Sequence, residues 1–385
     1  MDNHMDKRLS LFVAVTCGIA FFLGIELGGF SLVLLQVTKF FDLNNIMMGT
    51  LVTSQFSAVT AGPLIFGWAA DRFGKKTVLL ISVPLVFLGY FGAAFSGTVS
   101  FLIGALVVAG IGFSVSESIC SSALSDSFPG RESKYLNLMQ CAFCLGAVLS
   151  PQLFSRLFAA GIASWRAVFL LTGGGFTVLF PLLCISRCKP PLPAKSCPEQ
   201  ALVGAKRIFS PRLFLLLACM MSYVAIETGV GFFADALYVT EYSNSSLGAH
   251  AISLFWLAMT LSRFGFAHIK TKMRDIVILG FSATIALFLL LMLVKNQWFL
   301  LVIFALLGVT TGPIWPMVFG IGASSFREKS GTVGSILYAG GGFGGTIIPV
   351  VIGWVSGWAG FYGGFWALVA AAALGLTAIW LVKKF

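Results

Sequence analysis

Charged residues are scarce in this chain. Of its 385 residues only 10% are Asp, Glu, Lys or Arg, and 58% are hydrophobic. A water-soluble domain carries roughly 25% charged residues. The composition therefore excludes an ordinary soluble domain. Because no group of residues in the sequence points to catalysis, we expect a protein that is not an enzyme.

Sequence signs of a bound metal or cofactor are also missing. Cys184, Cys188 and Cys197 do not have the spacing of a zinc site. The glycine cluster at 340–345 follows no strand and precedes no P-loop lysine, so it does not resemble a phosphate-binding loop. We expect neither a metal nor another cofactor.

Long hydrophobic runs fill most of the chain. Each is about 20 residues or longer, enough to cross a hydrocarbon core of ~30 Å. Backbone groups in lipid must be satisfied within the segment, so runs of this length predict helices and not barrel strands. The sequence predicts an all-α membrane protein with twelve transmembrane helices, near 10–40, 46–70, 77–97, 100–127, 135–158, 166–186, 212–240, 246–268, 275–295, 297–325, 330–355 and 359–382.

The net charge of +11 is explained by membrane topology. With the N-terminus inside the cell, most of the 25 Lys and Arg residues fall in cytoplasmic segments. This is the bias that the positive-inside rule describes. We therefore expect a multi-pass membrane protein with both termini in the cytoplasm. We expect its location to be the plasma membrane, namely a bacterial inner membrane, and its state to be a monomer. The lipid bilayer is its expected surrounding, and the charge requires no nucleic acid.

The chain contains an internal duplication. A polar segment rich in Pro, Lys and Arg predicts a cytoplasmic linker at 187–211, between six-helix bundles at 1–186 and 212–385. A shift of 198 residues aligns equivalent positions of the halves, namely Gly110 with Gly308, Gly146 with Gly344 and Pro151 with Pro349. Two such pseudo-symmetric repeats are typical of secondary transporters, which bind solute between the repeats.

The loop after the second hydrophobic run reads "GWAADRFGKK", Gly67 to Lys76. It resembles the signature of the major facilitator superfamily, in which a Gly, an Asp-Arg pair, a Gly and two basic residues follow the second span. The resemblance implies the major facilitator fold and a gating loop. This loop would bind Asp126 and release it when the two halves of the protein rock against each other. A purely topological role for the basic residues is the alternative. The gating residues implied are Gly67, Asp71, Arg72, Gly74, Lys75, Lys76 and Asp126.

Other segments resemble the fucose/galactose/glucose–proton symporter branch of that superfamily. They are "FPGRESKYLNLMQCAFCLGAVLSP" (128–151), "YVAIETGVGFF" (223–233), "SLFWLAMTLSRF" (253–264) and "GPIWPM" (312–317). Glu26 stands where fucose transporters carry an aspartate. The resemblance implies proton-coupled uptake of a sugar-like solute, with Gln140 and Asn137 in the sugar-contacting region.

Three acids lie deep inside hydrophobic runs. Glu26 and Glu227 are counterparts in the two halves, and Glu117 lies in the fourth run. No Lys or Arg occurs at comparable depth in the same runs, so the sequence shows no ion pair for these acids. Desolvation favours the neutral form of a carboxylic acid, and wetting permits its ionisation. We expect all three to couple proton movement, with a structural hydrogen bond or direct substrate contact as the alternatives.

Amides and aromatic rings complete the predicted site. Gln140 and Asn137 are three residues apart and share a helix face, while Gln55 is a further candidate. Trp256 and Trp315 are candidate platforms for the apolar face of a sugar, since Pro313 and Pro316 break the helix around Trp315. The alternatives are amide bonds between helices and ordinary aromatic packing.

The sequence thus predicts a transporter that imports a monosaccharide or similar small polar solute together with protons. Three alternatives stay open at this point. They are a proton-driven exporter of small drugs or metabolites, a sodium-coupled sugar transporter, and a non-transporting sensor on the same fold.

Overall fold

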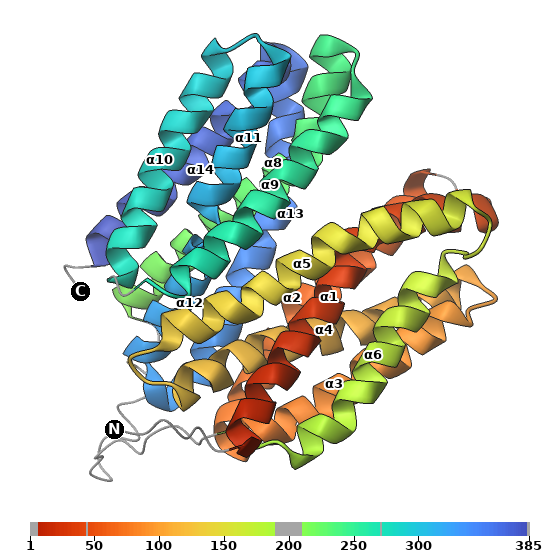
Figure 1. Ribbon diagram of the computed structural model, residues 1–385, viewed down its shortest axis with the longest axis vertical. Helices are drawn as coiled ribbons and strands as arrows, with labels where there is room; N and C mark the ends of the chain where they lie inside the picture. The colour runs from red at the N-terminus through yellow and green to blue at the C-terminus, as the bar shows by residue number, and fades with distance from the viewer. Residues whose placement is uncertain (1–6, 44, 189–209, 270–271, 383–385) are drawn as a thin grey trace. The chain divides into compact units, whose positions relative to one another are not determined.

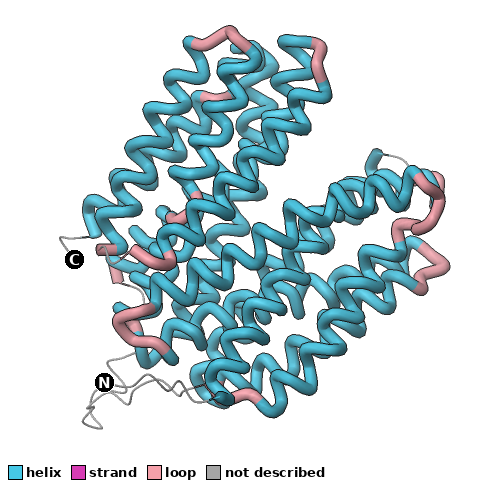
Figure 2. Tube along the Cα trace, in the orientation of Figure 1, coloured by secondary structure: helices cyan, strands magenta, loops and turns pink. Residues whose placement is uncertain are grey.

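The described parts of the chain are almost entirely long helices, and most of these helices are joined by short connections (Figures 1 and 2). A computed structural model describes residues 7–43, 45–188, 210–269 and 272–382. Most of the predicted linker at 187–211 lies outside the described residues. No strand occurs within these four ranges.

The helices before the linker begin and end within a few residues of the predicted runs. Their bounds are α1 (Lys7–Phe40), α2 (Asn45–Phe73), α3 (Lys75–Ala94), α4 (Val99–Ser127), α5 (Glu132–Ala159) and α6 (Arg166–Ile185). The helices after the linker are α8 (Pro211–Tyr242), α9 (Ser245–Phe266), α10 (Met273–Leu293), α11 (Gln297–Thr311), α12 (Ile314–Ser325), α13 (Ser330–Gly364) and α14 (Trp366–Leu381).

Ten stretches of helix within the described ranges are long and apolar enough to cross a membrane. One of them runs from Gln297 to Ser325, so α11 and α12 are two parts of one span. The helices α2 and α9, of 29 and 22 residues, occupy the places of the other two predicted spans. Helix α13 extends past the predicted end at 355, with non-helical backbone at Gly360, where φ is 76°.

The chain divides into two compact units. Unit 1 holds residues 1–129, 138–192 and 327–339, and unit 2 holds residues 130–137, 193–326 and 340–385. The first turns of α13 therefore belong to unit 1, and the first turns of α5 belong to unit 2. The domain limits predicted from the sequence stay a prediction.

Equivalent pairs of helices are neighbours in the two units. In unit 1, α1 and α3 both contact α6, and α4 contacts α2 and α3. In unit 2, α8 and α10 both contact α14, and α11 contacts α9 and α10. The two sets correspond if α1, α2, α3, α4 and α6 are matched with α8, α9, α10, α11 and α14. The duplication read from the sequence is therefore present in the packing.

Gly146 and its aligned partner Gly344 lie where two helices approach closely. A methyl group at Gly146 of α5 would lie 2.1 Å from the carbonyl oxygen of Phe21 in α1. At the aligned Gly344 of α13, it would lie 2.1 Å from the carbonyl oxygen of Met221 in α8. Small residues let membrane helices approach this closely, and van der Waals packing then stabilises the pair.

Enlarging Gly146 should therefore destabilise the protein. We expect Gly146→Ala to lower the stability by about 1–3 kcal/mol, because the added methyl group forces α1 and α5 apart. The change is measured as the shift of the thermal unfolding midpoint in detergent. Gly104→Ala is the matched control, since a methyl group there meets no atom within 4 Å. Equal midpoints for both variants would contradict this account of the α1–α5 contact.

Candidate functional site

Glu26 lies on α1 with its side chain buried at 1% exposure. The side-chain nitrogen Nε2 of Gln55, on α2, donates a hydrogen bond of 2.8 Å to its Oε1 atom. The hydroxyl of Tyr90, on α3, lies near the same carboxylate but outside hydrogen-bond geometry. The described residues give Glu26 no ion-pair partner. The structure thus brings together Glu26 and Gln55, two of the predicted site residues.

Glu117 lies on α4, and donors from two other helices bind its carboxylate. Gln140 Nε2 of α5 donates to Oε1 over 3.0 Å, and the Tyr338 hydroxyl of α13 donates to Oε2 over 2.7 Å. Tyr338 is absent from the residues predicted from the sequence. The available signal is weak, because it is one of 7 tyrosines and lies beside a glycine cluster.

Asn137 is fully buried on α5. Its Nδ2 atom donates to the backbone oxygen of Ser133, 2.8 Å away in the same helix. Its Oδ1 atom is buried and has no hydrogen-bond partner in the part of the chain that the structure describes. The Oε1 atom of Gln55 is likewise buried and without a hydrogen-bond partner among the described residues. Each amide therefore retains an acceptor, which a hydroxyl group is able to satisfy.

Glu227 of α8 has a cationic neighbour within unit 2. The Arg263 guanidinium of α9 lies 3.7 Å from its carboxylate, and the Tyr223 hydroxyl donates to it over 2.6 Å. This contact corrects the expectation that the three deep acids have no ion pair. The sequence alone does not indicate this ion pair, because Arg263 lies near the end of the neighbouring predicted span.

Arg263 also satisfies a backbone carbonyl at the break between α11 and α12. Proline has no N–H, so Pro316 leaves the carbonyl oxygen of Gly312, four residues earlier, without its helical donor. Arg263 Nε donates to that oxygen over 2.8 Å. Arg263 is 1% exposed, and its Nη2 atom donates to the Tyr223 hydroxyl over 2.7 Å. A buried cation is thus held by a carbonyl, a hydroxyl and a carboxylate.

The two predicted tryptophan platforms are both in unit 2. Trp315 lies in the first turn of α12, is 6% exposed, and stacks on Phe319 with ring centroids 5.0 Å apart. Trp256, on α9, is half-buried and meets Phe255 edge to face at 5.7 Å. These contacts position both rings, and their contact with substrate stays a prediction.

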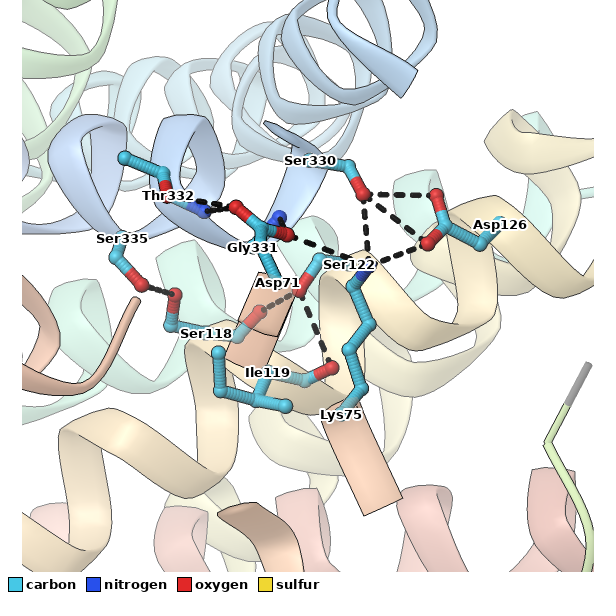
Figure 3. A network of polar contacts seen from close by, with 10 residues as sticks. All are labelled: Asp71, Lys75, Ser118, Ile119, Ser122, Asp126, Ser330, Gly331, Thr332 and Ser335. Atoms are coloured by element: carbon cyan, nitrogen blue, oxygen red, sulfur yellow. Dashed lines mark hydrogen bonds and ion pairs between the residues drawn. The ribbon is translucent and has the colours of Figure 1, made fainter. Parts of the chain in front are cut away.

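Asp71, in the last turn of α2, caps the first turn of α13, which belongs to unit 1 (Figure 3). The motif predicted as a loop is thus mostly helical, because α2 continues to Phe73 and α3 begins at Lys75. The Asp71 carboxylate accepts hydrogen bonds from the backbone nitrogens of Gly331 and Thr332, over 2.9 and 2.8 Å, and from the Thr332 hydroxyl. The free N–H groups and the positive dipole end of a helix favour a carboxylate at that position. Asp71 therefore acts mainly as the cap of α13. Lys75 Nζ lies 3.9 Å away.

Lys75 and Asp126 form a buried ion pair beside this cap (Figure 3). Ser330, the first residue of α13, donates to both carboxylate oxygens of Asp126 and accepts from Lys75 Nζ over 2.8 Å. The predicted attachment of the basic loop to Asp126 is thus present in the structure, through Lys75. Whether the attachment gates transport stays a prediction.

The other residues of the motif have separate local roles. A methyl group at Gly67 would lie 2.5 Å from the Ser335 side chain, so Gly67 permits α2 to approach α13. Gly74 has φ of 92°, which favours glycine at the turn into α3. Lys76 donates to backbone carbonyls at the end of α6, and the exposed Arg72 stacks over Trp68.

Comparison with known proteins identifies the family. A model of the Major Facilitator Superfamily matches residues 15–294. The chain belongs to this superfamily. It is therefore a multi-pass membrane protein of a transporter family and not an enzyme.

Several transporters are similar to parts of the chain. The 3-(3-hydroxy-phenyl)propionate transporter of Escherichia coli K12 is 25% identical over 69% of this chain and 60% of its own length. An enterobactin exporter of Citrobacter koseri is 30% identical over 56% of the chain and 52% of its own length. The arabinose-proton symporter of Escherichia coli K12 is 29% identical over 42% and 34%. The chain thus matches between about a third and three fifths of the length of these relatives.

Solved structures show the same fold. A variant of the Escherichia coli fucose:proton symporter FucP has a TM-score of 0.83 and 15% identity over 98% of this chain and 99% of that one. The proton:xylose symporter XylE has a TM-score of 0.77 and 15% identity over 98% and 95%. At this identity the likeness establishes the all-α major facilitator fold alone.

The buried ion pair predicts a specific pattern of stability. We expect Lys75→Met to destabilise the protein by about 3–5 kcal/mol, because it leaves the Asp126 carboxylate buried without its cation. The double variant Lys75→Met/Asp126→Leu should recover most of that loss, since no buried charge remains. Thermal unfolding in detergent measures both effects.

Arg72→Gln is the control for this pair, because it removes a charge from the same motif, at an exposed side chain in the last turn of α2. It should change the stability by about 1 kcal/mol or less. A double variant no more stable than Lys75→Met alone would show that the two charges do not compensate each other.

Proposed function

We propose that the protein is a secondary active transporter that imports a monosaccharide or a similar small polar solute together with protons. The observation that carries the proposal is Glu26, a fully buried carboxyl group whose described neighbours include a neutral amide and no cation. Loss of water disfavours the charged form of such a group, and access to water restores it. Alternating access to the two sides of the membrane would thus load and release a proton.

Glu117 is proposed as the second proton-coupling residue. Its carboxylate lies between Gln140 and Tyr338, which come from different helices, so a change in its charge would alter hydrogen bonds to both. Glu227, paired with Arg263, is the third candidate. Ionisable groups inside the membrane commonly mark proton or substrate pathways.

Hydroxyl-rich solutes fit the unused hydrogen-bonding capacity. Gln55 and Asn137 each hold a buried acceptor without a donor among the described residues, and Gln140 is placed beside a carboxylate. Sugar hydroxyls would supply donors, and Trp256 or Trp315 would contact the apolar face of the ring. Recognition by hydrogen bonds discriminates well, because a solute without the matching hydroxyl leaves buried groups unpaired. The similarity to fucose, xylose and arabinose symporters supports this substrate class.

Gating is proposed to depend on the cap and ion pair in Figure 3. Asp71, Lys75 and Asp126 all bind the first three residues of α13. These contacts would stabilise the state in which the transport site is open to the outside. They would break when the two halves of the transporter rock to open the site to the inside. A bacterial inner membrane, cytoplasmic termini and a monomeric state complete the proposal.

Proton-driven export is the second candidate function. It is favoured by the similarity to an enterobactin exporter over 56% of the chain. The two functions differ in the direction of the proton relative to the solute, so they give opposite pH changes when solute is added to sealed vesicles.

Replacing Glu26 tests the proposed coupling role. We expect Glu26→Gln to abolish accumulation of solute against its gradient in proteoliposomes, because an amide neither binds nor releases a proton near neutral pH. Counterflow exchange, which needs no net proton movement, should persist. Unimpaired pH-driven accumulation by this variant would refute the role of Glu26.

Glu241→Gln is the matched control, since it makes the same chemical change at an exposed residue of α8. It should leave both accumulation and counterflow intact. Loss of accumulation in this variant too would mean that removal of any carboxylate impairs the assay.

A further inference from the structure

A basic pocket lies at one end of the unit 2 bundle. It has a volume of about 350 Å³ and is lined by the ends of α8, α10, α12 and α14. We call it the basic pocket, after its polar lining residues Arg212, Lys272, Arg274, Ser324 and Ser325.

The charge of the basic pocket is of one sign. Arg212, Lys272 and Arg274 bring three positive charges, and no Asp or Glu is among the lining residues that the structure describes. Asp275, the neighbour of Arg274 in sequence, is exposed and does not line it. Three cations around one cavity repel each other unless an anion lies between them.

Arg212 has an unused donor inside the protein. Its Nε atom is buried and has no hydrogen-bond partner within the described ranges of the chain. Buried N–H groups are nearly always satisfied, so such a donor at a cavity indicates an absent acceptor. Arg274 differs, because its Nε and Nη2 atoms donate to the backbone oxygens of Ile379 and Trp380 in α14, at 3.3 and 3.1 Å. These bonds fix one wall of the basic pocket.

The position of the basic pocket matches the edge of the membrane. Spans of unit 2 begin at Pro211 and Met273, and others end at Ser325 and Leu381, next to the lining residues. The phosphates of lipids lie at this level, just outside the hydrocarbon core. Apolar lining by Met273, Ile321 and Val382 suits the less polar part of a lipid beside its headgroup.

We propose that the basic pocket binds a phosphate group, and that the headgroup of an anionic phospholipid supplies it. Arginine presents a planar fork of N–H donors that matches phosphate oxygens, and lysine adds a point charge. Basic pockets between membrane helices bind such headgroups through this chemistry. Free phosphate carries the same chemistry, so the test includes it. This inference is independent of the transported solute and of its coupling to protons.

The test compares two charge-matched variants of the full-length protein in nanodiscs. Arg212→Gln/Lys272→Gln removes two of the three positive charges of the basic pocket. It keeps Arg274, which donates hydrogen bonds to α14. Arg131→Gln/Arg187→Gln removes two exposed charges elsewhere. Thermal unfolding is followed in phosphatidylcholine alone, with added phosphatidylglycerol, and with added inorganic phosphate. Native mass spectrometry then counts retained phosphatidylglycerol molecules.

We expect phosphatidylglycerol to raise the unfolding midpoint of the wild type and of the exposed-charge variant. Its apparent affinity should fall about tenfold in the pocket variant, the loss that removal of charged hydrogen bonds produces. Arg212→Lys, which keeps the charge but removes the fork, should weaken retention and serves if the double variant does not fold.

Equal retention of phosphatidylglycerol by the two double variants would overturn the proposal. So would the lack of any effect of phosphatidylglycerol on the wild type. Stabilisation by inorganic phosphate alone, lost in the pocket variant, would support the phosphate site and overturn the lipid as its source.

Discussion

The cost of placing a charge in hydrocarbon is the constraint on which this structure depends. An isolated ion buried in a medium of low dielectric is costly, so buried charges are paired, hydrogen-bonded or neutralised. The chain uses a different solution at each site. Arg263 is held by a carbonyl, a hydroxyl and a carboxylate, and Lys75 is held by Asp126 and Ser330. Glu26 lies beside a neutral amide and has no cation within ion-pair distance among the described residues, so neutralisation by a proton is the solution that we propose for it.

The same constraint links backbone irregularity to side-chain chemistry. The break between α11 and α12 frees the carbonyl oxygen of Gly312, and Arg263 satisfies it. The first amides of α13 have no partner within their helix, and Asp71 satisfies them. Non-helical or terminal backbone is thus tolerated at these places because a charged side chain reaches it from another helix. Loss of either side chain would leave backbone groups unpaired, and loss of Arg263 would also leave the Glu227 carboxylate without its cation.

Sequence reasoning predicts the parts of this protein that depend on one helix at a time. The helix bounds follow from hydrophobic runs, and the equivalence of Gly146 and Gly344 follows from the duplication. It does not predict the Arg263–Glu227 contact, the donor role of Tyr338 or the capping role of Asp71. Each depends on how a helix is rotated toward its neighbours, which hydropathy does not specify. The attachment to Asp126 is predicted only because a family motif carries it.

The central claim is that solute moves together with protons carried by the buried acids. The most direct measurement is the external pH of proteoliposomes on addition of a panel of hexoses, deoxyhexoses and polyols. The account predicts that one solute class makes the outside more alkaline, since protons enter with it. Acidification on addition of a transported solute, or transport of a sugar with no pH change, would contradict it.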